Sequence, residues 1–170
     1  MVYIRYCTDD NVAGIEEVLK NGELVTYDSI GSEIDYATSL SGVDTSSVVG
    51  RNGFFVFRAD SLEESIEYAL DFSKQKSADG GSVIDDRTHV VIFDVPEKLD
   101  NELIDNGDIV CGDEQGGLYY TDDDRYKEIP EAVLCDEAII KLINEGCVNI
   151  IPVEEFLYDP YYIMDCDDCM

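Results

Sequence analysis

The chain has 170 residues, a length that favours one domain with a single apolar core. Its 39 acidic residues against 11 lysines and arginines give a formal net charge of -28, which excludes direct binding to nucleic acid or to an anionic membrane. Hydrophobic residues make up 45% of the chain, so the acidity does not mark a disordered polyanion.

Three explanations of the charge are open from the sequence. An acidic surface can be an adaptation to high salt, although the chain keeps isoleucine, asparagine and six cysteines, and has lysine about as often as arginine. A carboxylate surface can instead imitate a phosphate backbone and occupy a basic cleft. An enzyme that docks on a basic substrate protein would also need such a surface.

The first half of the chain contains four clear elements and one irregular region. Residues 2–7 alternate and predict a strand, and a helix is predicted over 11–20, ended by Asn21-Gly22. A short strand is predicted at 24–27 and an apolar strand at 53–58. The segment between these two strands is rich in serine, glycine, aspartate and threonine and predicts a long loop.

A second helix and a buried strand follow. Ser61 and Glu64 form a capping box, which predicts a helix that runs to about Lys74. The run HVVIFDV at 89–95 predicts a central strand, and 99–104 a short helix.

The remaining elements are shorter. Strands are predicted at 108–111 and 118–121 as a pair joined through glycines, and a third at 126–129. Asp136 is predicted to cap a helix that Gly146 ends, and 148–153 forms a last strand.

These elements predict an α+β fold with a mostly antiparallel sheet and about three helices, because regular βαβ alternation and a phosphate-binding loop are both missing from the sequence. Residues 1–157 are expected to form one globular domain, and 158–170 an acidic, tyrosine-rich tail. Since no apolar run reaches the length of a signal peptide or a membrane span, we expect a soluble cytoplasmic protein.

Three segments resemble the motifs of the ADP-ribosyltransferase fold. The opening YIRYCTDDNVAGIEEVLKNGEL is similar to its first strand and helix, and GFFVFRADSLEESIEYALDFS to its middle strand and helix. KEIPEAVLCDEAIIKL resembles its last motif, in which a glutamate at a strand start precedes a helix. The resemblance covers about half of the chain and implies a split β-sandwich.

The resemblance also implies site residues and a cofactor. Arg5 would hold a nicotinamide dinucleotide (NAD), and Phe55 or Tyr68 would lie near its nicotinamide ring. Glu128 would be the catalytic glutamate, which orients the ribose and stabilises the positive charge that develops on the sugar. This chain departs from the family where members with a first-motif arginine carry a Glu-x-Glu pair, because Glu128 and Glu131 are three apart.

Each of these residues also has a structural interpretation. Arg5 can be an ion-pair partner within a carboxylate cluster, and Glu128 a solvated glutamate at a strand end. His89, the single histidine, is interpreted as a strand-end residue.

No metal site is predicted. Cys166 and Cys169 have the spacing of half a zinc site, but a second pair of ligands is missing. The acidic runs 85–86 and 122–124 lack the spacing of an EF-hand.

Two functions therefore follow from the sequence. The first is an ADP-ribosyltransferase-like domain that binds NAD and docks on or modifies a basic protein. The alternative is a non-enzymatic acidic inhibitor that blocks the basic cleft of a nucleic-acid-binding protein or nuclease.

Overall fold

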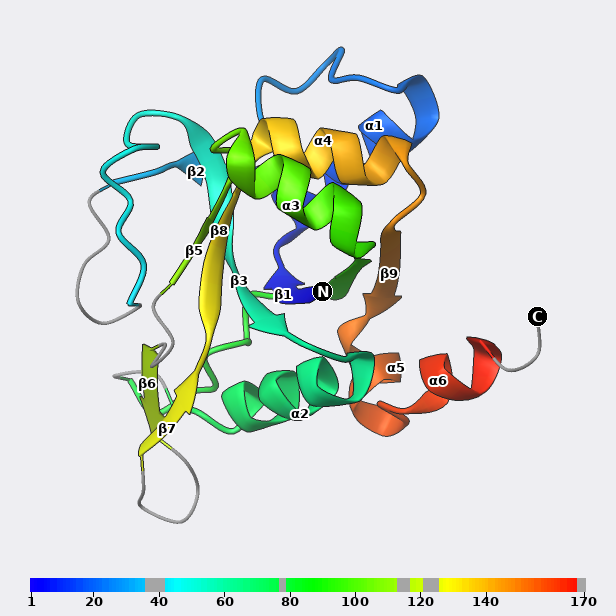
Figure 1. Cartoon of the computed structure of the whole chain (residues 1–170). Coiled ribbons are helices and arrows are strands. Elements are labelled where there is room, and N and C mark those ends of the chain that lie inside the picture. Colours follow the sequence, from blue (N-terminus) through cyan, green and yellow to red (C-terminus); the bar gives the residue numbers. More distant parts are fainter. Residues whose placement is uncertain (36–41, 77–78, 113–116, 121–125, 168–170) are drawn as a thin grey trace.

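An antiparallel sheet lies between two layers of helices (Figure 1). The computed structural model describes residues 1–35, 42–76, 79–112, 117–120 and 126–167. In spatial order, the main sheet consists of β5 (Ile109–Cys111), β8 (Glu131–Cys135), β3 (Asn52–Ala59), β1 (Val2–Cys7), β4 (His89–Asp94) and β9 (Val148–Pro152). The short strand β2 (Ser32–Glu33) pairs with β3 beside this path, and β6 (Gly117–Tyr120) pairs with β7 (Tyr126–Ile129) as a separate two-stranded sheet.

The described strand pairs are all antiparallel, which confirms the predicted α+β class with its mostly antiparallel sheet. One face of the main sheet is covered by α1 (Asp9–Asn21), α3 (Glu97–Asp105) and α4 (Asp136–Asn144) (Figure 1). The other face is covered by α2 (Leu62–Ser73), α5 (Val153–Tyr158) and α6 (Tyr162–Asp167). The described part of the chain thus has six helices rather than the three or so predicted. α5 and α6 have six residues each, too few to show a helical period in sequence.

Strand alternation divides the apolar side chains between the two faces of the sheet. On β1, Tyr3 and Cys7 belong to the cluster beneath α1, α3 and α4, whereas Ile4 and Tyr6 belong to the cluster beneath α2 and α5. Because both faces are buried, the central strands read in sequence as nearly continuous apolar runs.

Side-chain hydrogen bonds cap the first two helices, and α1 begins at Asp9, two residues before the predicted start. The Thr8 hydroxyl accepts a hydrogen bond from the Asn11 N–H (3.3 Å), and the Asn11 amide oxygen accepts one from the Thr8 N–H (3.2 Å). The Ser61 hydroxyl accepts from the Glu64 N–H (3.1 Å). The Glu64 carboxylate accepts from the N–H of Asp60, one residue earlier than a capping box requires (3.2 Å).

Two predicted elements are wrong. Residues 24–27 do not form a strand, because the N–H groups of Val25, Thr26 and Tyr27 donate to the Glu17 carboxylate and so cannot join a ladder. The strands predicted at 108–111 and 118–121 do not pair with each other. β5 pairs with β8 in the main sheet, and β6 pairs with β7.

The prediction that Asp136 caps α4 is wrong, because Asp136 is the first residue of the helix. Its carboxylate accepts hydrogen bonds from the N–H groups of Ile30 and Gly31, both at 3.0 Å. This carboxylate therefore ties the loop after α1 to the start of α4, a contact between distant residues that no local pattern reveals.

The segment predicted as a tail begins inside α5 and includes α6. Ile163 and Met164 of α6 are partly buried against the cluster beneath α2 and α5. Among the helices of the described ranges, none is both long enough and apolar enough to cross a bilayer.

Candidate functional site

Arg5 and Phe55 lie on one small cavity. It has a volume of about 100 Å³, and its other lining residues include Phe72 of α2, Arg87 and Glu131. Two of the residues that the family resemblance implies as cofactor-binding are thus neighbours in space, although 50 positions separate them in sequence.

Arg5 lies where the ladder between β1 and β3 ends. The last pair in register is Ile4 with Phe57, and beyond it the Arg5 Nη1 donates to the Phe55 carbonyl oxygen (2.9 Å). The guanidinium carbon lies 4.7 Å from the centre of the Phe54 ring, in the geometry of a cation–π contact. Burial lowers the pKa of Arg5, and its Nε has no hydrogen-bond partner among the residues that the structure describes. Arg5 therefore closes the gap between two strands, and one of its donors has no described partner.

Glu131 is a buried carboxyl on the same cavity. It is the first residue of β8, its side chain is buried, and its Oε1 has no partner within the described part of the protein. Burial raises its pKa to about 8, so the carboxyl carries a proton at neutral pH and can donate a hydrogen bond. A signal for this residue exists in the sequence, because Glu131 directly precedes the apolar run AVLC, but that run was not predicted to be a strand.

Tyr68 lies on a neighbouring cavity of about 320 Å³, lined also by Arg58, Glu64 and Glu131. Burial, followed by the nearby Glu64 carboxylate, raises the pKa of the Tyr68 hydroxyl to about 12. Glu131 thus lines both cavities, whereas Tyr68 and Phe55 lie on different ones.

Glu128 belongs to β7, where its backbone is in register with Leu118 of β6. Its side chain lies outside the described part of the structure. Among the described glutamates, the one that lines the Arg5 cavity is Glu131.

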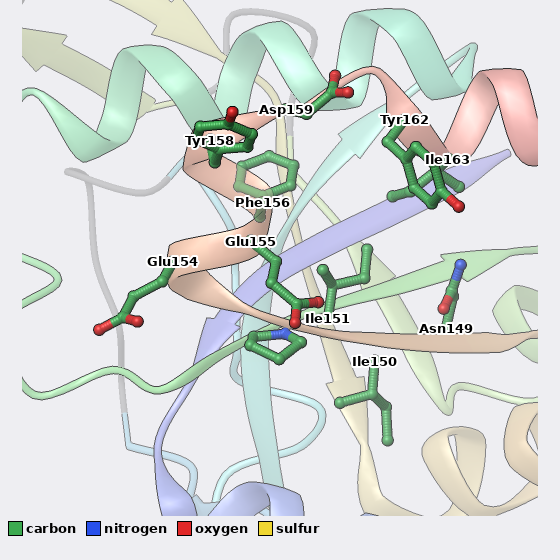
Figure 2. A pocket seen from close by; sticks show the side chains of 11 residues that line it. Asn149, Ile150, Ile151, Glu154, Glu155, Phe156, Tyr158, Asp159, Tyr162 and Ile163 are labelled. Carbon is green, nitrogen blue, oxygen red and sulfur yellow. The ribbon is translucent and has the colours of Figure 1, made fainter.

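A larger groove lies between β9, α5 and α6 (Figure 2). Its volume is about 830 Å³, and its apolar lining includes Ile150, Ile151 and Ile163. Its charged lining residues are carboxylates, and Figure 2 shows the Glu155 side chain pointing towards β9. Tyr158, the last residue of α5, lines the same groove and is 92% exposed.

The charged residues that line the groove are Glu154, Glu155 and Asp159, all exposed. Lysine and arginine are missing from the described lining of the groove. A ligand in this groove would meet an apolar floor and a negative rim.

Most arginines of the described part are held by contacts within the chain. Arg51 pairs with Asp108 (2.7 Å) and with Glu137 (3.0 Å). Arg58 pairs with the buried Asp100 (3.0 Å). A further two pairs are Arg87 with Asp86 (3.3 Å) and Lys141 with Glu145 (3.0 Å). These cations therefore offset carboxylates of the same chain, of which only Asp100 is buried, and the acidic excess remains.

The other residues singled out in the sequence lie apart from the Arg5 cavity and from the β9 groove. His89 is the first residue of β4 and therefore lies at a strand end, as interpreted from the sequence. Its Nδ1 lies 2.9 Å from the Thr88 hydroxyl oxygen. Within the described ranges, no group of three or more histidine, cysteine, aspartate or glutamate residues is placed to hold a metal ion. The Asp122–Asp124 run and Cys169 lie outside the described residues, and so does the side chain of Cys166.

No protein-family model, curated protein or solved structure matches this chain. The candidate sites therefore stand on their own geometry.

Proposed function

We propose that this protein is a strongly acidic binding protein that occupies and blocks the basic surface of a partner, without chemistry of its own. A nuclease or another nucleic-acid-binding protein is the partner class, because its cleft is built to hold a polyanion. The observation that carries the proposal is the excess of 39 acidic over 11 basic residues, a formal net charge of -28. Arg5, Arg51, Arg58, Arg87 and Lys141 already contact groups of the same chain, which further reduces the positive charge that a partner would meet.

Electrostatics gives this surface two expected properties. It accelerates encounter with a positive cleft and excludes nucleic acid from direct binding, and both effects weaken as salt screens the charges. The exposed carboxylates around the β9 groove supply negative charge next to apolar area, a combination that can bind as well as steer.

The test is displacement of nucleic acid. A fluorescent DNA duplex is bound to a purified basic DNA-binding protein or nuclease, and this protein is then added while anisotropy is followed. We expect release of the duplex at low salt and weaker release as NaCl is raised from about 0.05 M to about 0.5 M. An acidic protein of similar size is the control. Retention of the duplex across a panel of basic proteins would overturn the proposal.

A second candidate function is ADP-ribosyl transfer with NAD, favoured by the shared cavity of Arg5, Phe55 and Glu131. The unused Nε of Arg5 and Oε1 of Glu131 are groups that a polar ligand could satisfy. At about 100 Å³ the cavity is smaller than the ~300–1,000 Å³ usual for ligand pockets, so it would take the nicotinamide ring while the rest of NAD lay outside.

This candidate is tested with labelled NAD. Binding is measured up to about 1 mM, the upper end of usual KM values, and transfer of labelled ADP-ribose to basic proteins is followed. Glu128→Gln and Glu131→Gln are compared, because the resemblance assigns catalysis to Glu128 whereas the cavity contains Glu131. Absence of binding in this range would remove the candidate and leave the binding proposal unaffected.

A further inference from the structure

The groove beside β9 runs along an open edge of the main sheet. β9 is the last strand in the sheet order and pairs only with β4 among the described strands. The exposed edge of a strand presents N–H and C=O groups to which another strand can bond. Edge and groove therefore form one continuous surface.

Hydrogen bonds at the two ends of β9 show which of its residues face outward. The Cys147 carbonyl oxygen accepts from the Asp94 N–H (3.1 Å), and the Val153 N–H donates to the Thr88 carbonyl oxygen (3.0 Å). Both groups point towards β4. Since the direction alternates along an antiparallel ladder, Val148 and Ile150 direct their N–H and C=O groups away from the sheet.

We propose that the β9 edge and its groove bind an extended basic segment of the partner protein, which joins the main sheet as an additional strand. This inference rests on the proposed function and names how the partner is held. The backbone of the segment would bond to Val148 and Ile150, and apolar side chains on one of its faces would lie over Ile151 and Ile163.

Charge selects the occupant. Lysines and arginines of the segment would lie near Glu154, Glu155 and Asp159, which line the groove. A second copy of this chain would instead bring two molecules of net charge -28 together, and an acidic segment would meet the same repulsion. Pro152 lacks an N–H and ends the bonding edge, so the added strand would be short.

The probe is a synthetic peptide of about eight residues, a usual strand length, in which valine and lysine take turns along one face of the strand and threonine occupies the other face. The control peptide has glutamate in place of each lysine. Titration by calorimetry is combined with amide hydrogen exchange followed by NMR. We expect the basic peptide to bind and to slow exchange at Val148 and Ile150 at least tenfold, while Asn149 and Ile151, which face β4, change little.

The matched variants are the doubles Glu155→Gln/Asp159→Asn at the groove and Glu16→Gln/Asp105→Asn on α1 and α3, across the sheet. Each removes two negative charges and keeps side-chain shape. The groove variant is expected to bind the basic peptide about tenfold more weakly, whereas the control variant loses less than about twofold.

The remaining outcomes separate this inference from the proposed function. Salt-sensitive binding without protection of Val148 and Ile150, or equal effects of the two double variants, would overturn the β9 site and leave the acidic-binding proposal standing. Protection of the edge in the free protein, together with a dimeric mass by light scattering, would assign the edge to a second copy. If the peptide and the basic proteins all fail to bind, both proposals fall.

Discussion

The Arg5 guanidinium donates a 2.9 Å hydrogen bond to the Phe55 carbonyl oxygen, at the point where β1 and β3 stop pairing. Arg5→Met keeps the length of the side chain and removes its donors, which leaves a strand carbonyl without a partner. We expect a loss of about 1–3 kcal/mol in the free energy of unfolding, measured by urea denaturation. Lys20→Met, on the exposed side of α1, is the control and is expected to change little. Equal stability of Arg5→Met and the wild type would contradict the structural role of Arg5.

Glu131 makes stability depend on pH. Because its pKa is raised by burial from 4.5 to about 8, its protonated form stabilises the fold fully below pH 4.5, and this contribution is lost as pH rises through about 8. Glu131→Gln imitates the protonated form at every pH. Relative to the wild type, we expect the variant to be nearly unchanged at pH 5 and more stable by about 1–3 kcal/mol at pH 9.

Urea denaturation at the two pH values checks this prediction, with Glu16→Gln as a control at an exposed position on α1. A stability difference for Glu131→Gln that is the same at both pH values would show that the carboxyl does not titrate with folding.

Salt should stabilise this protein. At a net charge of -28 the folded chain repels itself, and salt screens that repulsion over a Debye length of about 10 Å at 0.1 M. We expect the midpoint of urea unfolding to rise between about 0.05 M and about 0.5 M NaCl, with a folded protein at both ends. Loss of the native circular dichroism spectrum at the lower concentration would instead favour adaptation to a high-salt habitat.

Gly53 lies where three strands approach closely, since it is in register with Ser32 of β2 and with Cys135 of β8. A Cβ at this position would lie 2.3 Å from the Leu134 carbonyl oxygen. Gly53→Ala must therefore shift backbone, and we expect a loss of about 2–3 kcal/mol in the free energy of unfolding.

The matched control is Gly50→Ala. Gly50 has φ +87°, and a Cβ there would have no atom of the described residues within 4 Å, so the left-handed backbone opposes alanine at about 1 kcal/mol. A smaller loss at Gly53 than at Gly50 would argue against the close approach of β3 and β8.

The sequence predicts the elements that carry their own signals. Ser61 marks the start of α2, and the apolar runs at 53–58 and 89–95 become β3 and β4. Where partners come from distant parts of the chain, prediction fails. The pairing of β5 with β8 is the clearest case, because a register between distant strands leaves no mark on neighbouring residues.

The candidate sites divide in the same way. Arg5 and Phe55 were predicted through a family resemblance, and the structure brings them to one cavity. Glu131 was not predicted as a site residue, because burial of a charged side chain is decided by tertiary packing rather than by its own type. The β9 groove was missed since α5 and α6 are too short to be recognised, although the tyrosines at 158–162 were noted as a feature of the predicted tail.

The order of strands in the sheet has a kinetic consequence. β3 takes its place between β1, made early, and β8, whose Glu131 is in register with Phe57. During synthesis β3 therefore waits for the 71 residues between Ala59 and Glu131 with one bonding edge open, and pairing between such distant segments is slow. Chains that wait in this state risk joining one another edge to edge. The same negative charge that is proposed to recognise a basic partner would keep the nascent chains apart until β8 arrives.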